Sequence, residues 1–144
     1  MTHRIIRTEA DLEEWISLLR ARSRPMTVQA KAGADRSLDQ NSTMWMWAGE
    51  YAGQLGDVTA KEVQHRWKLE IGVPILRSEE PTFCAWYDAK IKGWTYTEKL
   101  EAMEWIPVTS LMTVPQMTAL MDAIQKEAAE QGIRLTDPEE RKAA

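Results

Sequence analysis

The chain has 144 residues, of which 44% are hydrophobic and 28% charged, and its formal net charge is −4. This length suits one domain with its own buried core, and the composition excludes disordered, collagen-like and low-complexity chains. No apolar run reaches the length of a membrane span, about 18 residues, and the N-terminal segment MTHRIIRTEADLEEW lacks the apolar part of a secretory signal, so we expect a cytoplasmic protein without a membrane partner.

The charge is distributed unevenly along the chain. Residues 1–100 contain 14 basic and 14 acidic side chains, whereas residues 101–144 contain 4 basic and 8 acidic ones. Between Trp15 and Ala34 there is no acidic residue at all, and the basic residues there are Arg20, Arg22, Arg24 and Lys31. A local positive patch is therefore compatible with the acidic total.

The N-terminal segment predicts two short strands around a helix. The run HRIIRT within Thr2 to Thr8 is compatible with a strand, and Thr8 then begins a T-x-x-D capping pattern before apolar residues at helical spacing. We expect a helix from Glu9 to Arg22, ended before Pro25. The alternating segment MTVQAKA predicts a second strand, paired with the first.

Two capping boxes predict the next helices. Ser37 with Gln40 forms S-x-x-Q, which predicts a helix from Leu38 to about Leu55. Thr59 with Glu62 forms T-x-x-E and predicts a third helix, ending near Pro74.

The second half of the chain also favours helices. Residues 73–98 are the least informative, with a short helix around Phe83 to Ile91, and Lys99 to Trp105 suit another turn or two. Thr113 with Gln116 predicts a last helix that ends at Gly132. We therefore expect an α+β fold, with a small N-terminal β-sheet and a helix followed by a helix-dominated remainder, in one domain (1–133) with a polar C-terminal tail (134–144).

The residues for a metal or nucleophilic site are scarce. The chain has two histidines and one cysteine, Cys84, which we interpret as a small core side chain. No phosphate-binding glycine loop or hydrolase motif is present. We expect no enzyme activity, cofactor or metal; a nuclease assembled from Asp35, Asp39 and Glu50 stays open as an alternative.

Seven tryptophans are many for a chain of this length. Trp15, Trp67 and Trp105 lie on apolar helical faces, which predicts that they anchor the core. The helix from 38 to 55 gathers an apolar arc, which is wide enough to face more than one surface. The arc consists of Leu38, Trp45, Ala48, Ala52 and Leu55, and Met44, Tyr51 and Trp47 widen it to about half of the circumference.

The beginning of this helix is the candidate site. Arg36, Gln40, Asn41 and Trp45 would surround a helix N-terminus, whose amides favour a phosphate, while the indole offers a face to a base. The alternative is that Ser37 and Gln40 only cap the helix, Asn41 bonds locally and Trp45 belongs to the core.

The run RSLDQN followed by Trp45 resembles the phage NinB or Orf family of recombination mediator proteins, and TSLM at 109–112 and the pair Gly132 and Ile133 are compatible with it. The resemblance implies a small α+β homodimer, of phage or prophage origin in a bacterial host cell. Such a protein would bind single-stranded DNA without sequence preference and assist a recombinase on DNA coated by single-strand binding protein.

The resemblance carries over Arg36, Gln40 and Trp45 as DNA-binding residues, and Ser110 as a weaker match. The chain departs from the family pattern at Leu111, where that pattern has a basic residue. Arg20, Arg22 and Arg24 offset this departure, because nonspecific binding needs positive charge but no fixed position. Their alternative role is to complement the end of their own helix.

We therefore expect a non-enzymatic binder of single-stranded DNA whose acidic C-terminal end competes with the strand. Two alternatives remain open, namely a protein-interaction module that does not contact DNA and a metal-dependent nuclease.

Overall fold

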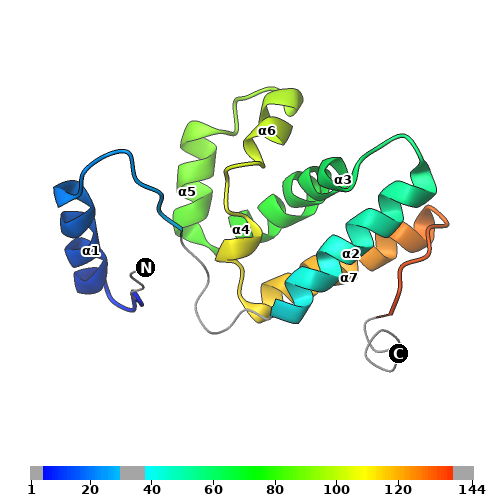
Figure 1. Cartoon of the computed structure of the whole chain (residues 1–144), viewed down its shortest axis with the longest axis horizontal. Helices are drawn as coiled ribbons and strands as arrows, with labels where there is room; N and C mark the ends of the chain where they lie inside the picture. Colours follow the sequence, from blue (N-terminus) through cyan, green and yellow to red (C-terminus); the bar gives the residue numbers. More distant parts are fainter. Residues whose placement is uncertain (1–4, 30–37, 138–144) are drawn as a thin grey trace.

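The computed structural model describes residues 5–29 and 38–137. These residues form an arrangement of helices joined by short loops (Figure 1). In chain order the elements are α1 (Glu9–Ala21), α2 (Leu38–Leu55), α3 (Ala60–Trp67), the π-helical turn η1 (Lys68–Gly72), α4 (Val73–Glu79), α5 (Pro81–Lys90), α6 (Tyr96–Ala102), the 3₁₀ turn η2 (Thr109–Leu111) and α7 (Val114–Glu130).

The expected α+β fold is wrong, because residues 5–29 and 38–137 contain no strand. The described parts of both predicted strands have no strand partner. Their apolar residues lie in solvent: Ile5 is 68% exposed and Val28 is 52% exposed. A strand is stabilised by pairing and by burying one face, and neither occurs here.

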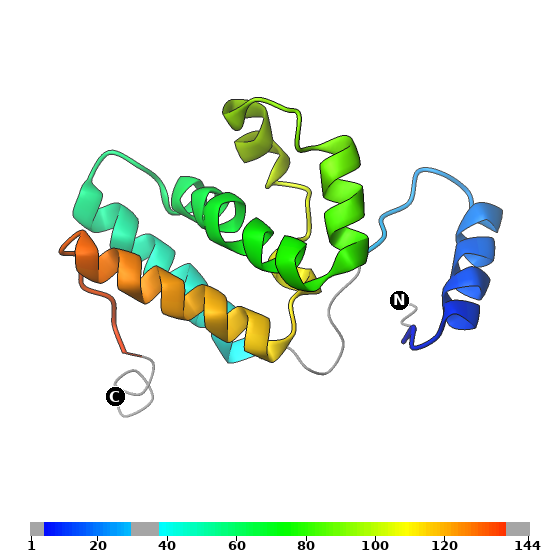
Figure 2. The same cartoon turned by 180° about the vertical axis from the view of Figure 1, so that it is seen from behind.

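The core lies where α2 packs against α3 and α7. Figure 1 shows α2 and α7 side by side, running in the same direction, and Figure 2 shows α3 and α4 from the opposite side. The α2 side chains facing this core follow the spacing i, i+3, i+4, i+7, i+8 of an amphipathic helix. They are Met44, Trp47, Ala48, Tyr51 and Ala52.

The third helix does not end near Pro74 as expected. Instead α3 continues through η1 into α4, with Pro74 in the first turn of α4. A proline costs least in a first turn, and the preceding wider turn avoids the clash that would break a regular helix. The side chain of Leu76, two residues later, is fully buried.

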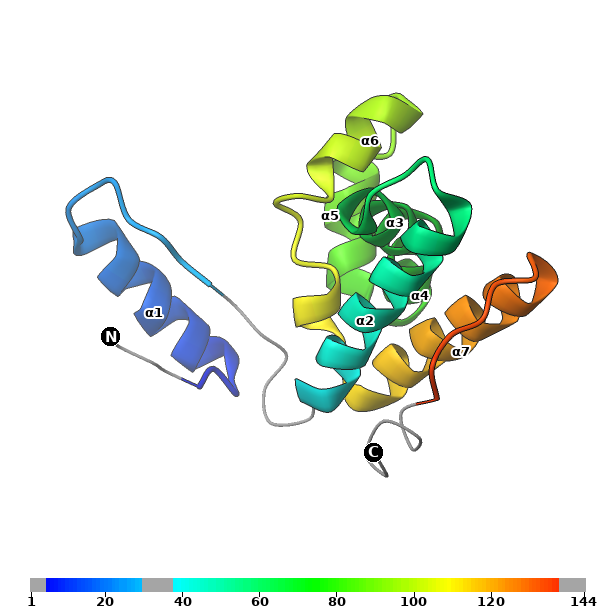
Figure 3. The ribbon, with the colours of Figure 1, turned by 45° about the vertical axis from the view of Figure 1, so that its right-hand side comes forward.

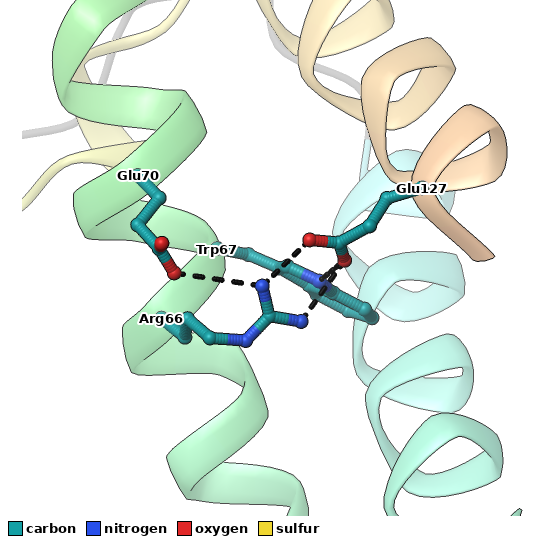
Figure 4. Close-up of polar contacts among 4 residues, drawn as sticks. All are labelled: Arg66, Trp67, Glu70 and Glu127. Atoms are coloured by element: carbon teal, nitrogen blue, oxygen red, sulfur yellow. Dashed lines mark hydrogen bonds and ion pairs between the residues drawn. The ribbon is translucent and has the colours of Figure 1, made fainter. Parts of the chain in front are cut away.

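A polar network fixes α3 to α7 (Figure 4). The Arg66 guanidinium donates two hydrogen bonds to the Glu127 carboxylate, at 2.6 and 2.9 Å, and the Trp67 indole donates a third at 3.0 Å. Glu70 lies 3.5 Å from the same guanidinium. Because the Arg66 hydrogen bonds favour the charged carboxylate, the pKa of Glu127 is lowered.

The segment after α7 lies along α2 as a strap formed by residues 133–137. The Trp47 indole donates a hydrogen bond to the Thr136 carbonyl at 2.8 Å, and the Thr136 amide donates to Glu50 at 3.0 Å. Gln54 binds both the carbonyl and the amide of Arg134. The strap therefore covers an indole of the core.

Helix α1 stands apart from the other helices in Figure 1 and Figure 3, and none of its residues is buried. It begins as expected, because Thr8 and Asp11 form the predicted capping box. Of the helices in the described ranges, none combines the length and apolar character that crossing a membrane would require.

Candidate nucleic-acid interface

The beginning of α2 lies beside α7. Helix α2 spans the predicted range, from Leu38 to Leu55. The Gln40 side-chain amide donates a hydrogen bond of 2.9 Å to the hydroxyl of Thr118, in the second turn of α7. This contact positions Gln40 between two helix beginnings that lie at the same end of the molecule (Figure 1).

Trp45 lies outside the buried stripe of α2. The stripe is centred on Trp47 and Ala48, whereas the Trp45 side chain is 47% exposed. Of the expected apolar arc, Ala48 and Ala52 are buried, as are Met44, Trp47 and Tyr51, whereas Trp45 and Leu55 are each 47% exposed. An accessible indole offers the flat surface on which a nucleobase can stack.

Asn41 and Ser110 are both half-buried. Asn41 follows Gln40 in the first turn of α2, so its amide is not enclosed in the apolar core. Ser110 lies in η2, three residues before Thr113, the N-cap of α7. Leu111, where the chain departs from the family pattern, packs against the hydrophobic core.

The arginines of the predicted positive patch are on a different part of the molecule from α2. Arg20 lies in the last turn of α1 and Arg22 caps it, and both are exposed, as is Arg24. Helix α1 stands apart from α2 in Figure 3, so Arg20 is on a different helix from Trp45. The remaining predicted site residues, Lys31 and Arg36, and the predicted cap Ser37 lie outside the described residues.

The three tryptophans expected in the core differ from one another. Trp67 is fully buried, as expected. Its ring centroid lies 5.5 Å from that of Tyr51, in an edge-to-face arrangement. Trp15 is half-buried on α1. The expectation for Trp105 is wrong, since its side chain is 57% exposed. The apolar spacing that suggested a core role comes from Ala102 and Ile106, which are buried beside it.

Of the three carboxylates in the nuclease alternative, the structure describes only that of Glu50. Asp35 and the side chain of Asp39 lie outside the described residues. The carboxylate of Glu50 accepts hydrogen bonds from the amide and hydroxyl of Thr136, so it takes part in holding the strap. Within residues 5–29 and 38–137, no group of three or more His, Cys, Asp or Glu side chains has the arrangement of a metal site.

His65 is half-buried on α3. Its Nε2 lies 3.1 Å from the Glu104 carboxylate, which also pairs with Lys61 at 3.0 Å. Burial lowers the pKa of His65, and Lys68 adds to this effect, while Glu104 opposes it. The hydrogen bond from Lys61 is the main cause that lowers the pKa of Glu104.

One exposed aromatic group was not anticipated from the sequence. Trp86, Trp94 and Trp105 lie in contact on the surface formed by α5, α6 and their connections. They fall in and next to the segment whose pattern was least informative, and tryptophans separated by eight and eleven positions carry no helical or strand periodicity.

The described site thus comprises an accessible indole and an amide in the first half of α2, with three exposed arginines at the end of α1 and just after it. The chain matches no family model, no curated protein and no solved structure.

Proposed function

We propose that this protein binds single-stranded DNA without sequence preference, as a non-enzymatic recombination mediator. The observation that carries the proposal is the exposed Trp45 on the first turns of α2. Base stacking on an aromatic ring tolerates any sequence, because every base has a flat face. The resemblance of RSLDQN and Trp45 to the NinB or Orf family supports the more specific role with a recombinase and single-strand binding protein.

The wider assembly is proposed on the resemblance alone. It consists of a homodimer acting on DNA coated by single-strand binding protein, within a bacterial host cell. Positive charge for the DNA backbone would come from Arg20, Arg22 and Arg24, and from Lys31 and Arg36.

A titration of labelled single-stranded and duplex DNA at two salt concentrations tests the proposal. We expect preference for the single strand, weaker binding at the higher salt and quenching of tryptophan fluorescence. Trp45→Ala should weaken binding by about 1 to 3 kcal/mol. Leu55→Ala is the matched control, because Leu55 is also 47% exposed on α2 but has no aromatic face. Equal losses in both variants would contradict stacking at Trp45.

A protein-interaction module is the second candidate, favoured by the exposed apolar side chains of α1. Leu18 is 50% exposed and Leu12 is 36% exposed on a helix without a buried residue. Such a helix gains stability by docking on another surface. Salt-insensitive self-association without any DNA binding would favour this candidate over the first.

A further inference from the structure

Three exposed tryptophans form a continuous aromatic surface, which we call the tryptophan cluster. Trp86 comes from α5, Trp94 from the turn after α5, and Trp105 from the segment after α6. The ring centroids of Trp86 and Trp105 are 6.5 Å apart at 85°, and those of Trp94 and Trp105 are 6.5 Å apart at 62°. Figure 2 shows α6 and the connection from α5 to α6 on the opposite side of the molecule from α7.

The cluster lies outside the core rather than within it. The side chains of Trp86, Trp94 and Trp105 are 37%, 40% and 57% exposed, whereas Phe83 and Ile106 next to them are buried. Exposed apolar patches of this kind mark binding surfaces in soluble proteins. Because an edge-to-face pair covers at most one face of one ring, the cluster still presents ring faces to a ligand.

Positive charge borders the cluster. Lys90 follows Trp86 by one turn of α5 and Lys92 precedes Trp94 by two residues, and both lysines are exposed. Two nearby carboxylates already have cationic partners. Asp88 binds Arg77 at 2.8 Å, and Glu104 binds Lys61 at 3.0 Å.

Two acidic residues of α6 are opposed to this pattern, and one of them, Glu98, already accepts a hydrogen bond of 3.0 Å from the Thr95 amide. Glu101 is exposed and lies one turn before Trp105. It is therefore the carboxylate whose removal should increase the attraction of an anion to the cluster.

We propose that the tryptophan cluster is a second binding surface for unpaired nucleobases, with the adjoining phosphates beside Lys90 and Lys92. This inference rests on the proposed function and enlarges it, since one strand would then contact both Trp45 and the cluster. Aromatic faces bordered by lysine are the combination that holds single strands without sequence preference. Protein interfaces, by contrast, are depleted of lysine.

The test compares a short and a long oligothymidylate, each labelled, binding to the full chain. Trp105→Ala should weaken binding of the long strand about 5- to 150-fold, the effect of losing one stacked base, and leave the short strand bound at Trp45. Trp45→Ala should weaken both strands. Because Trp105 is largely exposed, its variant should keep the unfolding midpoint of the unmodified chain, which urea titration checks.

Substitutions of exposed charged residues test the same inference without changing the packing of the tryptophans. Glu101→Gln should strengthen binding of the long strand, and Lys90→Gln with Lys92→Gln should weaken it and reduce its salt dependence. Lys126→Gln on α7 is the control, with no change expected.

The possible failures are distinguishable. If the unmodified chain binds neither strand, the proposed function and this inference fall together. If Trp45→Ala weakens binding while Trp105→Ala and Glu101→Gln leave it unchanged, only the cluster inference is overturned. A change in oligomeric state on Trp105→Ala, with unchanged DNA binding, would assign the cluster to a protein contact and also overturn it.

Discussion

Gly72 lies where η1 meets α4, at a point too tight for a side chain. A Cβ atom added there would lie 2.7 Å from Val108 Cγ1 and 3.4 Å from Met112 Cε. Both neighbouring side chains are fully buried, so neither moves without disturbing the core. The close approach of η1 to the Val108 segment therefore depends on the absence of a side chain at this position.

We predict that Gly72→Ala lowers the free energy of unfolding by about 1 to 3 kcal/mol, because overpacking outweighs the better helix propensity of alanine. Gly49→Ala on α2 is the matched control, since nothing lies within 4 Å of its added Cβ. That control should be neutral or more stable by about 0.5 to 1 kcal/mol. Urea titrations measure both variants, and equal stability of the two would contradict the predicted clash.

Glu127 makes the stability of the folded chain depend on pH. Its pKa is lowered in the folded chain, chiefly by the hydrogen bonds from Arg66, so the folded state favours the charged carboxylate. The resulting stability is fully present above the unfolded pKa, near 4.5, and is lost as the pH falls through the lower folded value.

We predict that Glu127→Gln lowers the unfolding free energy at neutral pH by about 1 to 3 kcal/mol, the cost of losing charged hydrogen bonds. The variant should also lose part of the decrease in stability that the unmodified chain shows below pH 4.5, the ordinary value for this carboxyl group. Glu130→Gln, exposed at the end of the same helix, is the control and should keep that decrease. Urea titrations across this pH range would contradict the prediction if both variants behave alike.

At the scale of elements, the helix beginnings were predictable because their chemistry is local. The boxes Thr8 with Asp11, Thr59 with Glu62, and Thr113 with Gln116 all form as predicted. Each needs only residues three positions apart. Thr95 with Glu98 forms a fourth box, and its T-x-x-E pattern is present in the sequence although the prediction overlooked it.

The errors concern contacts between distant segments. Pairing of the two N-terminal strands depended on a partner that the fold does not supply, so β propensity alone was insufficient. The exposure of Trp105 depends on how α5 and α6 pack, and the spacing of apolar residues within one helix carries no information on that packing. For the candidate site, the sequence left two positions of Trp45 open, one accessible to a base and one in the core, and its 47% exposure agrees with the first.

The strap after α7 is an element that the polar composition of the tail did not predict. We expect that removing residues 134–144 costs roughly 2.5 to 7.5 kcal/mol, because the five hydrogen bonds lost to Trp47, Glu50 and Gln54 contribute about 0.5 to 1.5 kcal/mol each. Removing only residues 138–144 retains these contacts and is the control. Urea titration followed by tryptophan fluorescence compares them, and equal stability would show that the strap does not hold α2.

This contact also changes how competition by the acidic end should be tested. The longer deletion exposes Trp47 as well as removing charge, so tighter DNA binding by that variant alone would not identify an electrostatic effect. Asp137→Asn removes one carboxylate while keeping the Thr136 contacts, and it should tighten binding at low salt if the end competes with the strand.

On the scale of the whole molecule, three of the cations proposed to hold DNA lie in a different segment from the aromatic surfaces. The arginines at 20, 22 and 24 belong to the α1 segment, while Trp45 and the tryptophan cluster belong to the packed helices. A single strand bridging these parts would neutralise the arginines without needing them beside an indole, because counterion release depends on phosphate contacts and not on base contacts.

We therefore predict that replacing all three arginines with glutamine makes the dependence of binding on salt shallower. Each phosphate contact on a single strand contributes about 0.7 to the slope of log affinity against log salt. If each arginine contacts one phosphate, the slope should therefore become shallower by roughly 2. Lys126→Gln with Arg134→Gln removes charge from α7 and the strap as the control, and its slope should stay near that of the unmodified chain. An unchanged slope in the arginine variant would contradict the phosphate contacts. The arginines would then only complement the C-terminal end of α1, and circular dichroism of the variant would show reduced helix content.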